Sequence, residues 1–520
     1  MTDSELPASW VRVPLAELLT GIETGKSFKC DERLPMPNEV GIVKVSAVSW
    51  GEYREQESKT CLDAARINPS LFVRRGDFLF SRSNTIELVG ACVIAQQVGL
   101  RVMLSDKILR FRFADDAMKP WVLALLRSQQ GRLQIERLAS GNQDSMRNIG
   151  QERIGQIEVP LPPRAEQTRI VAKLEELLFD IDAGVAELKA AQKKLAQYRQ
   201  SLLKAAVEGA LTAEWRTRNT PLETGAQLLE RILTERRARW EAKQTLKFKE
   251  QGKPPPKDWQ KKYPEPVRPD TTGLPALPQG WVWASVDQLS GSIRNGISKT
   301  PNTDGRGFPI FKINAVRPMV VNFAATKHIE LDESEATEYW VEVGDLLATR
   351  YNGSVDLLGV FGMVKAVPQP TLHPDKLIRM KPLLGMKLGA WMEVCGNVGT
   401  SRSHLVSKVK TTAGQTGISG EDLKKTPIPL PPFFEQEAAL TDLEVLLQSI
   451  KDLEAPTELG LKQSTAQRQN ILRAAFSGQL VPQDPRDEPA SVLLARIRAE
   501  RAVRDAAKKP RGRAVTGQRP

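Results

Sequence analysis

Few residues in this sequence could perform catalysis, and none of them forms a recognisable catalytic constellation. Residues 21–27 read GIETGKS, which resembles a phosphate-binding loop but has one residue too few between its glycines. No parallel strand clearly precedes this segment, so we interpret it as a turn. The three histidines, His328, His373 and His404, lack the spacing of metal ligands, and we therefore expect no metal site.

Two further segments resemble catalytic sites only in part. Residues 430–433 (LPPF) are similar to the Asn/Asp-Pro-Pro-aromatic motif of amino-methyltransferases. Leu430 replaces the residue that must accept a hydrogen bond from the target amine, and the related residues 161–164 (LPPR) also lack the aromatic group. Asp375 and Lys376 lack a second acidic residue that would complete a nuclease metal site. We therefore predict that the chain by itself is not an enzyme and binds no cofactor.

Polar and basic residues in turns are better candidates for binding than for catalysis, and many of them recur in both halves of the chain. The net charge of +12 and the pI of about 9.4 favour a polyanionic partner. Arginine and asparagine carry donors that suit guanine and adenine edges in a DNA groove, and lysine suits phosphates. The alternative interpretation is that these residues form turns or structural hydrogen bonds. The candidate DNA-contacting residues are Lys26, Ser27, Arg82, Asn84, Lys107, Gln143, Ser298, Lys299, Arg350, Tyr351, Asn352, Lys376 and Gln415.

A long helix is predicted after the first group of these candidates. The prolines at positions 160, 162 and 163 exclude helix, because proline lacks the amide donor. From Glu166 to Glu208 apolar residues then alternate at spacings of four and three, the heptad pattern of a helix that packs on another helix. At ~1.5 Å per residue such a helix is roughly 65 Å long, which suits a spacer. Its packing residues include Leu174, Leu178, Ile181, Leu188 and Leu195.

The same plan occurs a second time in the chain. Glu166-Gln167 and Glu435-Gln436 each follow a PLPP sequence, 269 positions apart, and the helix ends RQSLLKAAVEGAL and RQNILRAAFSGQL keep that shift. The preceding segments repeat too, for example at Gly76-Asp77 and Gly344-Asp345. A period near 270 residues is far longer than the ~20–50 residues of a solenoid unit, so it indicates two complete modules.

The two long helices are expected to pack on each other, and antiparallel packing is the simplest closed arrangement within one chain. The second helix has a weaker seam, because Glu454 and Thr457 fall on it and Pro456 should interrupt and kink the helix. Its packing residues include Leu443, Leu447, Ile450 and Leu461. The predicted fold class is α+β, with two similar β-rich domains separated by two long antiparallel coiled-coil helices in a pseudo-two-fold internal repeat.

Composition limits the remaining possibilities. The 520 residues are 41% hydrophobic and 26% charged, which suits folded domains. Apolar runs are too short for a membrane span and no signal sequence is visible, so we expect a soluble cytoplasmic protein. The four cysteines form no CxxC motif and are expected to be reduced. Residues 236–262 hold ten Lys/Arg and, with prolines at 254–256, suggest a basic semi-rigid linker, and a disordered tail is expected after residue 507.

This order of domains and helices resembles the specificity (S) subunit of a type I restriction-modification system. The resemblance covers nearly the whole chain and rests on the two PLPP and Glu-Gln segments, the two Gly-Asp pairs and the matching helix ends. The insertion at residues 212–277 and the less regular second helix depart from the family pattern. Together these departures leave the spacing between the domains open.

The resemblance implies two target recognition domains, each reading one half of a split, asymmetric sequence in double-stranded DNA. It also implies that the helices set the distance between the half-sites and dock methylation (M) subunits, two of them, with restriction/translocation (R) subunits joining for cleavage. S-adenosylmethionine, ATP and Mg would be bound by those partners.

The expected division of the chain follows from these assignments. It comprises a first target recognition domain at 1–158, a first spacer helix at 159–211, a charged helix and Pro-rich linker at 212–277, a second target recognition domain at 278–428, a second spacer helix at 429–482, and a short helix with a basic tail at 483–520.

Three alternatives remain open from the sequence. The chain could be the specificity subunit of a related system that cuts on both sides of its site. It could be a coiled-coil scaffold whose end domains bind protein or glycan, which predicts binding that is insensitive to salt. It could also be an enzyme with an unrecognised site.

Overall fold

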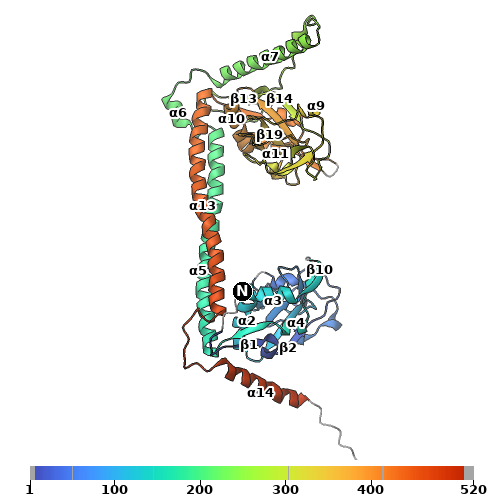
Figure 1. Cartoon of the computed structure of the whole chain (residues 1–520), viewed down its shortest axis with the longest axis vertical. Coiled ribbons are helices and arrows are strands. Elements are labelled where there is room, and N and C mark those ends of the chain that lie inside the picture. Colours follow the sequence, from blue (N-terminus) through green and yellow to red (C-terminus); the bar gives the residue numbers. More distant parts are fainter. Residues whose placement is uncertain (1–5, 50, 144–145, 303, 413–414, 509–520) are drawn as a thin grey trace, which may run out of the picture. The chain divides into compact units, whose positions relative to one another are not determined.

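The computed structural model describes residues 6–49, 51–143, 146–302, 304–412 and 415–508. Within this part the chain divides into two compact units, each of which mixes helices and strands as expected for an α+β protein. Unit 1 combines residues 1–189 with 458–520, and unit 2 is the continuous stretch 190–457. The two longest helices, α5 (Arg164–Val207) and α13 (Phe433–Phe476), each contribute one half to either unit (Figure 1). The tail that we expected to be disordered lies, beyond residue 508, outside the described residues.

Unit 1 is built around a four-stranded antiparallel sheet with the order β2-β9-β5-β7. Phe78 and Phe80 of one central strand stack on Phe111 of its neighbour, with ring centroids 5.3 and 5.0 Å apart. The regular elements of this unit besides α5 and α13 are β1 (Val11–Pro14), α1 (Leu15–Leu18), β2 (Leu19–Thr24), β3 (Gly41–Val43), β4 (Ser58–Thr60), β5 (Phe78–Ser81), β6 (Ser83–Asn84), β7 (Cys92–Ile94), β8 (Val102–Met103), β9 (Ile108–Phe113), α2 (Lys119–Arg127), α3 (Gln129–Leu138), β10 (Ser140–Gln143), β11 (Met146–Asn148), α4 (Gln151–Gly155), β12 (Glu158–Leu161) and α14 (Ala490–Lys508).

Unit 2 repeats this architecture with the sheet order β14-β21-β19-β20. Its further elements are α6 (Ala213–Arg218), α7 (Gly225–Glu250), β13 (Val282–Ser285), α8 (Val286–Leu289), β14 (Ser290–Asn295), β15 (Phe308–Phe311), β16 (Val316–Arg317), β17 (Val320–Val321), β18 (Thr326–Ile329), α9 (Glu333–Ala336), β19 (Leu346–Thr349), β20 (Phe361–Met363), β21 (Leu377–Pro382), α10 (Met386–Asn397), α11 (Gly399–Ser407), β22 (Lys410–Thr412), β23 (Gln415–Gly417), α12 (Gly420–Lys424) and β24 (Pro427–Leu430). The repeat seen in the sequence is therefore a repeat of structure.

In each unit the PLPP segment links the last strand of the domain to a long helix. Its strand pairs antiparallel with the first strand of the domain, β1 with β12 in unit 1 and β13 with β24 in unit 2. A core tryptophan secures each pair, because the indole nitrogen of Trp121 donates to the carbonyl of Pro160 at 2.9 Å and that of Trp391 to Pro429 at 2.7 Å. Entry to and exit from the domain thus lie side by side at the start of the helix.

The Glu-Gln pair after PLPP is buried and holds three separate chain segments together in unit 1. Glu166, only 1% exposed, accepts a hydrogen bond from the indole of Trp10 at 2.9 Å and another from Gln483, which follows α13. Burial raises the pKa of the Glu166 carboxyl, although the hydrogen bonds from Trp10 and Gln483 oppose that effect. Gln167 donates to the carbonyl of Pro162 at 2.9 Å and so fixes the turn into the helix.

The second Glu-Gln pair makes the equivalent junction in unit 2. Glu435, also 1% exposed, accepts from the indole of Trp281 at 2.9 Å and from Thr212 at 2.7 Å, and pairs with Arg216 at 2.6 Å. Thr212 and Arg216 follow α5, just as Gln483 follows α13. Gln436 repeats the bond of Gln167, here to Pro431 at 2.9 Å. Each junction therefore joins the start of one long helix to the segment that follows the other.

The halves of α5 and α13 pack antiparallel within each unit, as the heptad pattern predicted. In unit 1 Asp182 pairs with Arg468, and Leu188 lies against Gly460, where an added Cβ would be 3.1 Å from the leucine Cδ1. In unit 2 the α5 and α13 halves share one hydrophobic cluster. Of the expected packing residues, Leu174, Ile181, Leu443 and Ile450 are buried, and Leu178, Leu188, Leu195, Leu447 and Leu461 are half-buried.

The expected interruption at Pro456 is wrong. Helix α13 runs without a break from Phe433 to Phe476 with Pro456 inside it. Proline removes one amide donor from the helix, but a long helix that packs along a partner keeps its remaining hydrogen bonds and its apolar contacts. Tertiary packing therefore outweighs the local cost of this residue.

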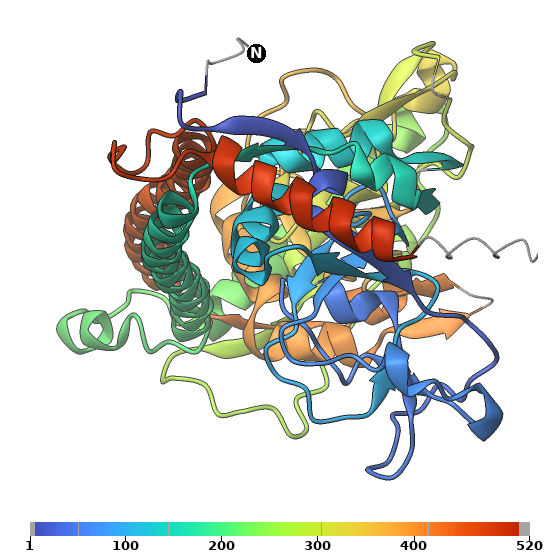
Figure 2. The same ribbon diagram turned by 90° about the horizontal axis from the view of Figure 1, so that it is seen from below.

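Short helices after the long ones dock on the domains. In unit 1 α14 contacts α1, and Arg498 of α14 pairs with Glu17 of α1 at 2.8 Å (Figure 2). At the start of α14 the amide of Ala490 donates to the carbonyl of Ser9, which precedes β1, at 2.9 Å. In unit 2 the equivalent helix α7 begins at Gly225, whose amide donates to the carbonyl of Gly280 at 2.7 Å. Helix α7 ends at Glu250.

Residues 119–138 form two helices, α2 and α3, because Ser128 leaves the helical conformation and caps α3 by accepting from the amide of Gly131. Within the described residues no helix is both long and apolar enough to cross a membrane.

We expect the Glu435→Ala substitution to lower the free energy of unfolding of unit 2 by about 3 kcal/mol. The substitution leaves the charge of Arg216 and the donors of Trp281 and Thr212 without their acceptor in a largely buried junction. Urea denaturation measures the effect. Glu444→Ala, at an exposed position on the same helix, is the control and should change stability by less than about 0.5 kcal/mol. Equal losses in both variants would contradict the role of the junction.

Candidate nucleic-acid interface

The candidate residues of unit 1 gather at one edge of the domain. Strand β5 leads into Arg82 and the short strand β6, which pairs with β11, and β11 pairs with β10. The amide of Arg82 donates to the carbonyl of Lys107 at 2.9 Å, and the amide of Ile149 donates to the carbonyl of Arg82 at 2.9 Å. Backbone hydrogen bonds thus bring Arg82, Asn84 and Lys107 together with the β10–β11 hairpin.

The side chains at this edge differ in freedom. Lys107 is exposed, whereas Arg82 is half-buried and its Nε lies 3.4 Å from Asn148 Oδ1. Asn84 is also half-buried, and its Oδ1 accepts from the amide of Thr85 at 2.9 Å. Gln143 ends β10, but its side chain lies outside the described ones. Lys107 is the best placed of these groups for a phosphate, while Asn84 serves at least in part as a turn residue.

The loop at residues 25–27 adjoins the same edge. The amide of Gly25 donates to the carbonyl of Ser105 at 3.2 Å, and the hydroxyl of Ser27 donates to Asp106. Lys26 is exposed beside a cavity of about 610 Å³ that Arg66 also lines. An added Cβ on Gly25 would lie 1.8 Å from the carbonyl oxygen of Leu104, so the glycine serves a close backbone approach. The turn expected at residues 21–27 is confined to residues 25–27, because residues 21–24 belong to strand β2 and pair with β9.

Unit 2 builds the corresponding edge from the same backbone contacts. The amide of Arg350 donates to the carbonyl of Lys376 at 2.8 Å, and the amide of Ile418 donates to the carbonyl of Arg350 at 2.9 Å. Asn352 is half-buried, and its Oδ1 accepts from the amide of Ser354 at 3.1 Å. Gln415 begins β23, and its side chain, like that of Gln143, lies outside the described ones.

Tyr351 is the distinctive group of this second edge. The Arg350 guanidinium lies 4.8 Å and the Lys376 ammonium 5.1 Å from the centre of its ring, so two cations hold the aromatic ring in place. Arg350 and Tyr351 line a cavity of about 410 Å³ together with Lys408 and Lys410. An anionic ligand at this cavity would meet positive charge from two sides.

The loop at residues 296–299 meets the edge through its backbone only. The amide of Ile297 donates to the carbonyl of His373 at 3.1 Å, and the amide of Asp375 donates to the carbonyl of Ile297 at 2.8 Å. Ser298 is exposed, but the Lys299 ammonium donates to the carbonyl of Glu330 at 2.8 Å. Lys299 is thus tied down by its own domain, which weakens it as a contact candidate.

The repeated Gly-Asp pairs belong to the frame of each domain. Gly76 and Gly344 have φ of +84° and +91°, the left-handed region that favours glycine. Asp77 accepts from the amide of Arg74 at 2.8 Å and from the buried guanidinium of Arg110 at 2.9 Å. Asp345 accepts from the amide of Glu342 at 2.9 Å, and its pKa is raised by burial.

Three basic residues at these edges were not among the sequence candidates. Arg147 lies on β11, paired with Asn84, and donates to the carbonyl of Gly141 at 2.7 Å. Lys408 and Lys410 lie at the start of the β22–β23 hairpin, and Lys410 is exposed. Their signal in the sequence was their closeness to Gln143 and Gln415. None of the three recurs at the equivalent position of the other module, so repetition in the sequence does not single them out.

In the described part of the chain no group of three or more His, Cys, Asp or Glu could hold a metal ion, and Cys30, Cys61, Cys92 and Cys395 are free thiols. His404 is half-buried, and burial lowers its pKa.

His373 is a structural residue of unit 2. It is buried, and its Nδ1 lies 2.7 Å from the carbonyl oxygen of Tyr339. Burial lowers the pKa of the imidazole to about 4, and the charges of Arg379 and Arg294 act in the same direction. The backbone carbonyl of His373 accepts the hydrogen bond from Ile297. The buried neutral imidazole therefore anchors the segment that holds the loop at residues 296–299.

Known proteins share this chain's length and plan. The specificity subunit of the type I restriction enzyme EcoKI from Escherichia coli (strain K12) is 31% identical over 515 residues, which cover 97% of this chain and 98% of that protein. The specificity subunit of the enzyme StySPI from Salmonella potsdam is 23% identical over 524 residues, 99% of this chain and 100% of that protein. No family model matches the chain.

The fold agrees with a solved structure of a type I R-M system. One chain of that structure superposes with a TM-score of 0.59 at 18% identity, covering 92% of this chain and 100% of the other. The chain described here belongs to the family of type I restriction enzyme specificity subunits.

We expect unit 2 to lose stability as the pH falls from about 6.5 to about 4, by about 3 kcal/mol through His373 alone. The unfolded imidazole takes up its proton near pH 6.5 and the folded one only near 4, so the contribution is complete above pH 6.5 and is lost below it. Buried Asp345 and Glu393 have raised pKa values and oppose this trend, so the measurement is a comparison with His373→Leu. The urea midpoint of the wild-type protein relative to that of the variant should fall as the pH falls from about 6.5 to about 4. A constant difference between them would contradict the assignment.

Proposed function

We propose that this chain reads a bipartite, asymmetric sequence in double-stranded DNA, one half with each domain. As a type I specificity subunit it recognises the DNA target and is not itself catalytic. The observation that carries the proposal is the pair of equivalent edges, built by the same backbone hydrogen bonds but lined by different side chains. The shared backbone hydrogen bonds place the two edges at the same position in each domain. The different side chains on the two edges would then recognise different DNA sequences.

The differences lie at the positions that a ligand would meet. Where unit 2 has Tyr351 between two cations, unit 1 has Ser83, and both residues occupy the same place in the pairing with the hairpin. The exposed Lys410 of unit 2 corresponds to Ser140 of unit 1 at the first position of the hairpin. Lys107 and Lys376 are common to both edges, which suits contacts to phosphates, because phosphates are the same at every sequence. Shared residues would thus position the DNA and unshared ones would read it.

We further propose that the long helices dock the methylation subunits, two per chain. Large apolar side chains are exposed on both helices, including Phe179 (74%), Val445 (62%) and Leu453 (59%). Apolar residues on the outside of a helical pair are a cost in water that a helical partner would remove. The pseudo-repeat offers two similar surfaces. Restriction subunits would join this complex in the cytoplasm, and S-adenosylmethionine, ATP and Mg would be bound by the partners.

Methylome sequencing of cells with and without this gene tests the proposed function. With the methylation partner present, we expect one gapped, non-palindromic sequence to carry methyladenine, because two unlike domains read its halves. A strain that expresses the partner alone is the control and should lack that methylation. An unchanged methylation pattern in a strain with a demonstrably active partner would sink the proposal.

A second test addresses the spacing. Insertion of one heptad after Lys189 in α5 and another after Thr457 in α13 keeps the packing seam and lengthens both helices by about 10 Å. We expect the gap between half-sites to grow by about three base pairs, at ~3.4 Å per pair, while both half-site sequences stay the same. Sequencing of methylated sites measures the outcome. Altered half-site sequences would show that the helices do not set the spacing.

A further inference from the structure

Residues 236–262 form a feature that the reading of half-sites does not require. They comprise the second part of α7 and the returning segment that ends with a 3-10 helix at Trp259–Lys262. We call them the basic hairpin. It contains ten Lys/Arg against Glu241, Glu250 and Asp258.

The basic hairpin is a folded structure, whereas its prolines suggested a semi-rigid linker. Trp240 stacks on Trp259 with ring centroids 5.7 Å apart, and Phe248 meets Trp259 at the same distance. Tyr263, 9% exposed, closes the base of the hairpin at 5.4 Å from Trp240. Four aromatic rings therefore hold the return segment against the helix.

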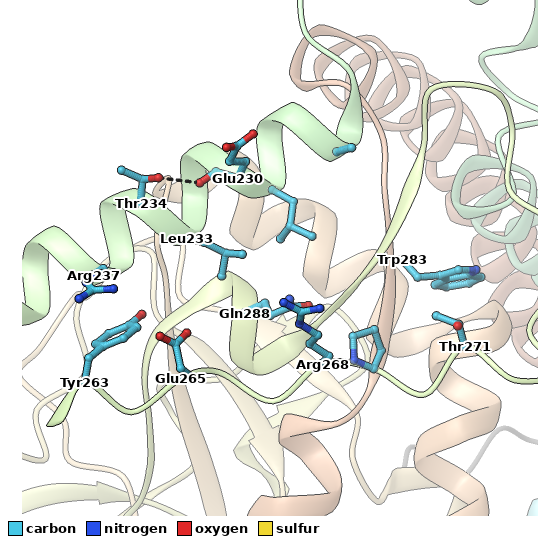
Figure 3. A pocket seen from close by; sticks show the side chains of 13 residues that line it. Glu230, Leu233, Thr234, Arg237, Tyr263, Glu265, Arg268, Thr271, Trp283 and Gln288 are labelled. Atoms are coloured by element: carbon cyan, nitrogen blue, oxygen red, sulfur yellow. Dashed lines mark hydrogen bonds between the residues drawn. The ribbon is translucent and has the colours of Figure 1, made fainter. Parts of the chain in front are cut away.

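Arg236 attaches the hairpin to the domain of unit 2. Its guanidinium donates to the Tyr263 hydroxyl at 2.8 Å and to the carbonyl of Pro264 at 3.0 Å, and lies 3.6 Å from Asp287. Beside this anchor a cavity of about 570 Å³ separates α7 from residues 263–271, with Arg237 and Tyr263 facing each other at one end (Figure 3). The arm is thus fixed at its base.

Within the described residues most of its cations form no close ion pair, although the charge of Lys243 acts on Glu338 at longer range. Four of the ten cations are paired, namely Arg236 with Asp287, Arg237 with Glu241, Arg239 with Glu235 and Lys261 with Asp258. The other six are exposed, and within the described part of the chain none of them lies within 4 Å of a carboxylate. They are Lys243, Lys247, Lys249, Lys253, Lys257 and Lys262. The lysines without an ion-pair partner repel one another on the basic hairpin. A bound polyanion would lower this electrostatic repulsion.

Within the part of the chain that the structure describes, only one module carries a basic hairpin. Leu228 and Ile232 of α7 are buried on unit 2, as Leu493 and Ile497 of α14 are on unit 1, so the docked parts of the two helices are equivalent. Beyond Ile232, α7 continues for several turns and folds back through the aromatic cluster. The α14 helix ends at Lys508 with no such return among the described residues.

We propose that the basic hairpin binds the phosphates of duplex DNA that flanks the half-site read by unit 2. This inference rests on the proposed function and adds a sequence-independent contact on one side of the site. Of the half-site candidates, Arg350 and Tyr351 line a cavity with Lys408, the residue that follows α11, whereas α7 contacts α8, β13 and β14. The aromatic rings are packed on one another, which leaves them unavailable for stacking on unpaired bases and favours duplex over single-stranded DNA.

The test exchanges all six unpaired lysines for glutamine in the full chain, assembled with its methylation partner. Affinity is measured for duplexes that contain the methylated sequence, with both flanks long or with one flank removed. We expect the wild-type complex to lose about tenfold in affinity at low salt when one particular flank is removed and little when the other is. The glutamine variant should bind all these duplexes alike, with a salt slope lowered by about 0.9 for each phosphate that the lysines no longer neutralise.

The matched control exchanges the same six lysines for arginine, which keeps the charge and should keep the flank dependence. The methylated sequence should be the same in all three proteins, since the half-site edges are unaltered. Unchanged affinity and salt slope in the glutamine variant would overturn the inference. So would failure of that variant to assemble with the partner while its DNA binding stays intact, which would identify a protein surface. Failure of the proposed function is separate, because the wild-type complex would then prefer no sequence at all.

Discussion

Everything in this fold depends on a buried carboxylate at the start of each long helix. Glu166 and Glu435 are both almost inaccessible to water, and each must find its hydrogen-bond donors inside the protein. The donors come from two places, the tryptophan at the entrance of the same module and the segment that follows the opposite helix. Each carboxylate therefore connects three segments: the entrance of the domain, the start of its own long helix and the segment that follows the other long helix. This is why the PLPP and Glu-Gln residues recur so closely while the domains between them differ.

The sequence predicted the parts of the structure that follow from periodicity. Heptad spacing identified the first long helix, and the constant shift of 269 positions identified the second helix and the two modules of the same plan. Expectations that rested on single proline residues were wrong where tertiary packing outweighs the local conformational preference of the residue. Pro456 was expected to interrupt α13, yet the helix continues through it because the partner helix holds both sides. The Pro-rich segment around residue 255 was expected to be a linker, yet Trp240 and Trp259 close it into a hairpin.

Sequence repetition is a weaker guide to the candidate interface than to the fold, for a physical reason. Repetition in sequence marks positions that the frame requires, as the contacts of Asp77 with Arg110 and of Gly25 with Leu104 show. Residues that read different sequences have no cause to repeat. Lys410 and Arg147 do not repeat between the modules, and only the placement of the β22–β23 and β10–β11 hairpins shows that they lie at the candidate edges. The repeated Arg82 and Arg350 could be placed at their edges from the sequence, but not their partial burial.

The division of the chain also has a consequence for its synthesis. Unit 2 is one continuous stretch, residues 190–457, set inside the two pieces of unit 1. Trp121 of the first domain packs on Phe476, with ring centroids 4.9 Å apart, and on a cluster that includes Leu493 and Ile497. All of unit 2 therefore emerges from the ribosome while the N-terminal domain still lacks part of its core. The first domain to be translated is the last to be completed, and until then its apolar face is exposed to chaperones and to other nascent chains.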